Sequence, residues 1–338
     1  MRTIALCVVI NVVLASVGVH GLLADDQTDK VVNAANALLN ALDESGKAQV
    51  QFKFNDEQQR LRWSNLPTGI FERRGLRMGD LKPQQAEAVM NVLKATLSEK
   101  GFQQIVDNVA AEETLNRGGQ RGRIVFGEDE FYFSILGTPS STDAWMWQFG
   151  GHHLAINATI VGDRITLGPS LTGGQPMHFT RDGQQVTQMA DEVAMAFELV
   201  NSLDAAQQKK AILGDRFTDM ILGPGKDDIK PDLEGIAGKD LTEAQATILK
   251  RLLAERVNLL NPDDATSRMK SFESQLPETY FSWRGPTTSG SPAYYRVQGP
   301  GVFLEFAPQQ MGGAPTEHIH AMYREFGNDY GEAWFKGQ

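Results

Sequence analysis

Apolar positions along the chain fall into blocks with helical spacing, followed by blocks with strand-like alternation. Spacings of three and four residues predict helices over 28–42, 82–97, 102–115, 191–203, 242–257 and 263–276. Short alternating or wholly apolar runs predict strands over 124–136, 145–149, 154–161, 165–167, 280–283, 293–298, 302–306 and 318–323. Helices followed by antiparallel strands are typical of an α+β fold.

This order of helices and strands occurs twice, and short residue matches recur in the same order. Asn40-Ala41-Leu42-Asp43 is matched 161 residues later by Asn201-Ser202-Leu203-Asp204. Tyr132-Phe133-Ser134 is matched 148 residues later by Tyr280-Phe281-Ser282. We therefore expect a tandem internal duplication in a pseudo-twofold arrangement. The expected boundaries are a signal peptide over 1–24, copy one over 25–190 and copy two over 191–338, the copies forming one globular unit.

Composition and charge narrow the class of protein. With 41% hydrophobic and 22% charged residues the chain reads as globular, and its net charge is −10 with no basic block. That charge argues against nucleic acid and anionic membranes as partners. Arg2, the apolar run 4–19 and small residues at Gly21 and Ala24 indicate a secretory signal peptide, the alternative being an uncleaved anchor. We expect an exported protein, periplasmic or extracellular, without a membrane span after cleavage.

The histidines are the main candidates for chemistry. The one cysteine, Cys7, lies within the signal segment, so the mature chain would have no thiolate ligand. Five histidines follow that segment, all near the predicted strands: His152, His153, His178, His318 and His320. Imidazole is a common ligand for copper, zinc and iron, so a transition metal ion is the expected cofactor.

Alternation along the predicted strands sorts these histidines by face. His153 and Asn157 share one face of a strand, whereas His152 lies on the other. In the duplication Glu305 of copy two corresponds to Asn157 of copy one, and the His-x-His motif puts two more imidazoles on one face. The expected metal ligands are His153, His318, His320 and Glu305, with His152 supporting the site or replacing His153 if the register shifts by one. The glycines of "GGHH" would let the backbone turn toward the site.

Aromatic residues near these positions are candidates for substrate binding. A stacking wall for a sugar or another planar molecule would use Trp145, Trp147, Tyr294 and Tyr295, with Asn157 beside it. The alternative for the aromatic residues is core packing. Thioethers would favour copper only where they approach the site, and the candidates are Met146, Met177, Met311 and Met322.

Several motifs resemble a known family. They are "FGGHHLAIN" (149–157), "GPSLTGGQP" (168–176), "SLDAAQ" (202–207), "GPTTSGSPAYYRVQGP" (285–300) and "EHIHAMYRE" followed by "NDYG". Together they resemble the bacterial family catalogued as domain of unknown function 3500, over nearly all of the mature chain. Glu317 stands where that family usually has asparagine. The resemblance implies no activity, so no residue role is carried over from it.

Three functions remain open from the residues alone. The leading expectation is an exported metal-dependent enzyme, hydrolytic or oxidative, with a histidine-rich site between the two repeats and a small-molecule or saccharide-like substrate. The first alternative is a non-catalytic envelope protein that binds a metal or small ligand. The second is a structural duplicated domain whose histidines are satisfied by hydrogen bonds.

Overall fold

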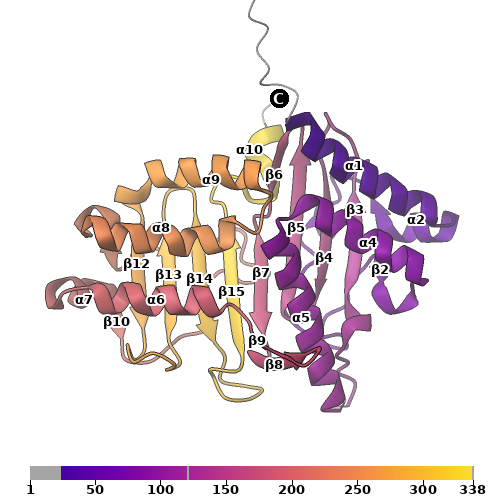
Figure 1. The fold of residues 1–338 in the computed structure, drawn as a ribbon. Helices are drawn as coiled ribbons and strands as arrows, with labels where there is room; N and C mark the ends of the chain where they lie inside the picture. Colours follow the sequence, from indigo (N-terminus) through magenta and orange to yellow (C-terminus); the bar gives the residue numbers. More distant parts are fainter. Residues whose placement is uncertain (1–23, 120–121, 337–338) are drawn as a thin grey trace, which may run out of the picture.

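The computed structural model describes residues 24–119 and 122–336, so the predicted signal peptide lies outside the described residues except for Ala24. Figure 1 shows one layer of helices lying over one face of a broad sheet. The α-helices are α1 (Ala24–Ala41), α2 (Glu44–Val50), α3 (Glu57–Arg60), α4 (Pro83–Thr96), α5 (Glu99–Arg117), α6 (Ala190–Ser202), α7 (Ala205–Ala211), α8 (Glu243–Val257), α9 (Pro262–Ser274) and α10 (Glu332–Phe335). This mixture of helices with a mainly antiparallel sheet agrees with the expected α+β class.

The sheet runs without interruption across both halves of the chain. Its strands follow the order β1-β3-β4-β5-β7-β15-β14-β13-β12-β10, with β2, β6 and β11 paired to its sides. Their bounds are β1 (Gln51–Phe52), β2 (Leu76–Arg77), β3 (Tyr132–Leu136), β4 (Trp145–Gly151), β5 (Leu154–Val161), β6 (Arg164–Thr166), β7 (Ser170–Gly174), β10 (Ile212–Gly214), β11 (Ile236–Ala237), β12 (Tyr280–Arg284), β13 (Tyr294–Gln298), β14 (Phe303–Pro308) and β15 (Ile319–Arg324). A separate hairpin of β8 (His178–Arg181) and β9 (Gln184–Thr187) lies below the end of β7 and beside α5 (Figure 1).

Strand β7 joins the two halves, and the sequence pattern did not predict it. It pairs antiparallel with β5 on one side and with β15 on the other. Thr172 is opposite Leu154 in the first pairing, and Gly173 is opposite His320 in the second. The strand therefore brings the end of the "GGHH" segment beside the His-x-His motif.

Elements on either side of β7 recur in the same order and with the same pairings. The short strand β1 is parallel to β3, as β10 is to β12, and β2 is antiparallel to β3, as β11 is to β12. Gln148 is opposite Asn157 in the first half, and Arg296 is opposite Glu305 in the second. Both of these residue pairs are related by an offset of 148.

Most predicted elements are present, because the apolar side chains that repeat along each of them pack into one hydrophobic core. The six predicted helices correspond to α1, α4, α5, α6, α8 and α9, and Thr242 caps α8 through the capping box expected from its sequence. The predicted strand 124–136 is too long, because residues Glu128–Glu130 form a 3-10 helix and β3 starts only at Tyr132. No helix within 24–119 or 122–336 is long and apolar enough to cross a bilayer.

The two faces of the sheet differ in chemistry. The face under the helices carries large apolar side chains such as Trp147, Ile156 and Leu304, all fully buried. The opposite face carries polar residues, including Gln148, Asn157 and Glu305, which are also buried. Side chains and backbone from the segments before β2 and before β11 form hydrogen bonds with them. The predicted polar face is therefore a covered layer rather than a free surface.

Candidate metal centre

His152 and His153 form the two-residue turn of a tight β-hairpin. Gly151, the last residue of β4, is paired with Leu154, the first of β5, so the two histidines connect the strands. His153 takes the left-handed conformation with φ of 59°. The expectation that the two side chains point to opposite faces is corrected here, because strand alternation does not extend into a turn. Their rings lie against each other, with centroids 3.5 Å apart.

Glu112 on α5 holds both histidines from the helical side. Its Oε1 lies 2.8 Å from His153 Nδ1, and its Oε2 lies 3.1 Å from His152 Nδ1. Asn108, one helical turn earlier, donates to the carbonyl oxygens of His153 and Gly173 at 3.2 and 2.7 Å. The sequence analysis missed Glu112. One feature of the sequence could have indicated it. Asn108 and Glu112 are four positions apart on the same helix face as the apolar Ile105, and this face is buried.

His318 and His320 reach His153 from the other half of the chain. His320 lies in β15, and His318 directly precedes that strand. The Nε2 atoms of His153 and His318 are 2.9 Å apart, and the ring centroids of His153 and His320 are 5.3 Å apart. One ligand atom from each of the three imidazoles lies within 4.8 Å of the other two. The structure therefore brings together three of the residues that the sequence predicted as ligands.

Gly173 in β7 makes this approach possible. Its N–H donates to the His153 carbonyl at 2.6 Å. A Cβ at this position would lie 2.6 Å from the Ile319 carbonyl oxygen and 3.2 Å from His153 Cβ. Any larger residue would therefore separate β7 from β15 or displace the His153 ring.

Burial keeps the three imidazoles neutral. It is the main cause that lowers the pKa of His153 to about 3, and the nearby His152 lowers it further. Burial also lowers the pKa of His318, and lowers that of His320 well below its ordinary value. For Glu112, burial alone would raise the pKa, but the electrostatic effect of His152 and the hydrogen bonds that both histidines donate outweigh it and lower the pKa. Neutral imidazoles beside an ionised carboxylate are the protonation states that metal ligation requires.

The hydrogen-bond partners fix which nitrogen of each ring carries its proton. The ionised Glu112 only accepts, so His153 donates to it through Nδ1. The Met311 carbonyl also only accepts, and His318 Nδ1 lies 2.5 Å from it, so His318 donates there. In neutral rings both Nε2 atoms are then acceptors, yet they face each other at 2.9 Å. Two lone pairs at this distance repel each other unless a cation, which is either a metal ion or an added proton on one of the rings, lies between them.

The site opens onto a cleft of about 1040 Å³. His152, His318 and His320 belong to its lining, whereas His153 is only 1% exposed and lies behind them. Asn65 also lines the cleft, and its amide nitrogen lies 3.2 Å from His320 Nδ1. A molecule in the cleft would therefore reach the imidazoles from one side only.

Glu305 is not part of the histidine cluster. It lies on the same sheet face as His320, but its carboxylate accepts hydrogen bonds from Ile221 N and Leu222 N, each at 2.7 Å, and from the Tyr294 hydroxyl. Burial raises its pKa to about 7. The Glu305 carboxylate is therefore bound by N–H groups of the loop before β11. The acidic residue beside the histidines is Glu112 instead.

The residues predicted to bind substrate lie away from the cleft. Asn157 bridges Gln148 and the Pro169 carbonyl in the covered polar layer. The four aromatic residues are buried, with their polar atoms bonded inside the protein: Trp145 to Ser140, Trp147 to Thr96, Tyr294 to Glu305 and Tyr295 to Glu192. None of these five residues lines the cleft. The four aromatic residues are therefore core residues, as the alternative of core packing proposed.

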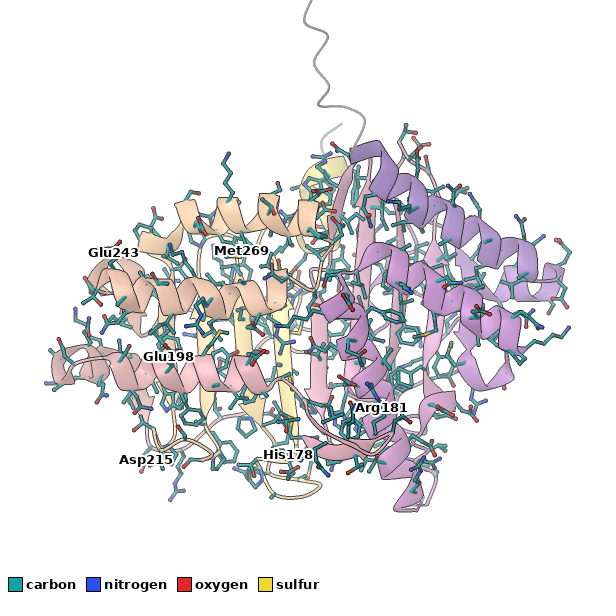
Figure 2. All side chains as sticks on the ribbon, viewed as in Figure 1. His178, Arg181, Glu198, Asp215, Glu243 and Met269 are labelled. Atoms are coloured by element: carbon teal, nitrogen blue, oxygen red, sulfur yellow. The ribbon has the colours of Figure 1, made fainter. Side chains whose placement is uncertain are left out.

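The remaining candidates divide between the cleft and the surface. His178 lies in the hairpin of β8 and β9, near the lower ends of the central strands (Figure 2). It is half-exposed and pairs with Glu317 at 2.6 Å. It belongs to neither group of possible metal ligands among the described residues. Of the four methionines singled out by sequence, Met311 lines the cleft, together with Met220, which was not singled out.

Comparison with known proteins agrees with the resemblance drawn from the motifs. A model of the family described as Protein of unknown function (DUF3500) matches residues 24–332 of the chain. Neither the curated proteins nor the solved structures give a significant match.

Proposed function

We propose that the chain, which belongs to the DUF3500 family, is a metal-dependent hydrolase whose ion is held by His153, His318 and His320. The facing Nε2 acceptors of His153 and His318 carry this proposal. Two nitrogens bound to one zinc ion at about 2.0–2.1 Å lie ~3.4 Å apart at the tetrahedral angle, so a shift of roughly half an ångström admits the ion.

The donor set supports a catalytic site rather than a closed structural one. Three protein ligands with a further position open to water or substrate is the usual arrangement of catalytic zinc. Here the open side would face the cleft, because His318 and His320 line it. A metal ion bound in this way supplies a water molecule whose pKa is low enough to give hydroxide near neutral pH.

The residues of the chain prepare the ligands for this chemistry. Glu112 accepts from His153 Nδ1 and so directs Nε2 toward His318. The Met311 carbonyl does the same for His318. Such partners behind the ligands orient the rings and increase their basicity. Asn65, in contact with His320 at the cleft wall, is placed to hydrogen-bond a bound molecule.

One observation favours oxidative chemistry as the second candidate. Met220 and Met311 line the same cleft as His318 and His320, and thioethers select copper over zinc. Identification of the bound metal separates the two candidates. A non-catalytic binding protein remains the alternative if the ion has no exchangeable position.

We also propose that the two halves arose by tandem duplication and that the protein is exported. Recurrent strand pairings at an offset of 148, on either side of β7, support the duplication. The apolar run after Arg2 supports export to the periplasm or the exterior. The metal site would then lie where the two copies meet.

Cobalt(II) substitution tests the proposed function. The full chain, purified without an affinity tag, is titrated with Co²⁺ and its visible absorption is recorded. We expect saturation at about one ion per chain, and a change in the bands when azide is added, because azide occupies an open position. Saturated bands that azide leaves unchanged would contradict the catalytic proposal and favour a closed site.

A further inference from the structure

The charged side chains that the structure describes in the lining of the cleft beside the metal centre are all acidic. Among the described residues that line it, none is lysine or arginine, whereas Asp219 and Glu317 contribute carboxylates. The net charge of the whole chain is −10. An anion that entered this cleft would lose hydration with no cationic side chain beside it, which is costly.

Apolar side chains surround the opening of the cleft. Six large apolar side chains are exposed among the described residues, and three of them line this cleft: Leu66 at 43%, Ile70 at 54% and Met311 at 82%. Phe126 and Phe217 also line it, and the Phe126 ring centroid lies 5.2 Å from that of His152. An exposed apolar patch around a concave site marks a binding surface for an apolar molecule.

The carboxylate of Asp219 is held in place at this surface. Its Oδ1 accepts from Met220 N at 2.7 Å and from Gln309 Nε2 at 3.0 Å. A positive group on a bound molecule would therefore be attracted toward Asp219.

We infer that the wall of the cleft takes an uncharged or positively charged molecule with an apolar, ring-sized body, and disfavours organic anions that do not coordinate the metal ion. This inference rests on the proposed function, because it names the substrate class of the same site. Glu317 contributes less than Asp219, since it already pairs with His178.

Three probes of similar size that differ in charge test the inference. They are benzyltrimethylammonium, benzyl alcohol and benzenesulfonate, none of which is a strong ligand for a transition metal. Binding to the full chain as purified is followed by ligand-observed NMR. We expect benzyltrimethylammonium to bind most tightly, benzyl alcohol next, and benzenesulfonate at least tenfold more weakly than the cation. Equal or tighter binding of benzenesulfonate would overturn the inference.

Two substitutions connect this preference to the cleft. Asp219→Asn should weaken benzyltrimethylammonium about two- to fivefold, as expected for one exposed charge pair, and leave benzyl alcohol unchanged. Ile70→Lys should weaken the cation and strengthen benzenesulfonate. Ile229→Lys is the matched control, because Ile229 is 43% exposed but lies outside the cleft lining. If Ile70→Lys and Ile229→Lys behave alike, the probes bind elsewhere and the inference fails.

Failure of the metal site has a different signature. His318→Ala should lose the metal and keep the ranking of the three probes, because the carboxylates and apolar side chains of the wall remain and the opposing positive charge of the ion is gone. A wild-type protein that binds no metal yet keeps the ranking would support the ligand class and overturn only the proposed catalytic function.

Discussion

His153 Nε2 and His318 Nε2 lie 2.9 Å apart, although the two residues are separated by 165 positions in the chain. Each ring donates a hydrogen bond through its Nδ1–H, His153 to the Glu112 carboxylate and His318 to the Met311 carbonyl. The pair therefore presents two lone pairs to one point, which a bound cation would stabilise. This relationship exists because β7 places the two halves of the chain side by side.

Glu112→Gln should weaken metal binding about 10- to 100-fold, the usual effect of losing the partner behind a ligating histidine. A glutamine keeps one acceptor oxygen, replaces the other with an amino group that cannot accept from an imidazole N–H, and removes the negative charge beside the two rings. Affinity is measured by competition with a chromogenic chelator. Glu113→Gln is the matched control, since Glu113 contacts Asn116 and Arg117 instead. Equal affinities for the two variants would remove Glu112 from the site.

Asn108→Ala should lower the free energy of unfolding by ~1–3 kcal/mol, because two buried carbonyl groups lose a donor. Gln103→Ala on the exposed side of the same helix should change it by no more than ~0.5 kcal/mol. Urea denaturation of both variants measures the difference. If Asn108→Ala is as stable as the control, α5 does not hold the histidine turn as described.

Glu305 should make stability fall as pH rises toward neutrality. Its pKa is raised by burial from 4.5 to about 7, so the folded protein keeps a proton that the unfolded chain has released. The stabilising effect of this proton is complete below about pH 4.5 and is lost as pH rises through about 7. Glu305→Gln resembles the protonated form and lacks this dependence. Between about pH 5 and 8 the wild type should lose roughly 2–3 kcal/mol relative to the variant.

Asp264 and Asp329, whose pKa values burial raises to about 6, shift stability in the same direction in both proteins. The difference between wild type and Glu305→Gln therefore isolates Glu305. Urea denaturation of both proteins at about pH 5 and about pH 8 measures this difference in the free energy of unfolding. A difference that stays constant with pH would mean that Glu305 is ionised throughout the range.

Periodicity was sufficient to predict the helices and most long strands, because their apolar faces pack on a single core. It was not sufficient for β7, whose residues Ser170–Gly174 are small or polar except for Leu171. This strand is ordered by pairing with β5 and β15. Strand β5 lies shortly before it in the sequence, but β15 lies near the other end of the chain, so no local pattern marks that pairing. The element that assembles the site was therefore the hardest to predict.

The candidate ligands were predictable only in part, for similar reasons. Three imidazoles could be grouped from strand alternation and the repeat, but a two-residue turn reverses the chain at His152 and His153. Glu112 resembles an ordinary surface residue of a helix until α5 is packed against that turn. Glu305 lies on the sheet face that the pattern predicted, but its carboxylate accepts hydrogen bonds from the N–H groups of Ile221 and Leu222 and not from the histidines.

The metal content of the purified protein tests the central claim most directly. Elemental mass spectrometry of the tag-free chain should find about one first-row transition metal ion per chain, since the two groups of possible ligands share His153. His153→Asn, which suits the left-handed turn, and His318→Ala and His320→Ala should each lose most of that ion. His178→Ala should keep it, because His178, in the hairpin of β8 and β9, pairs only with Glu317. An ion retained equally by all four variants, or no binding by the wild type after incubation with Zn²⁺, Cu²⁺ and Fe²⁺, would contradict the account.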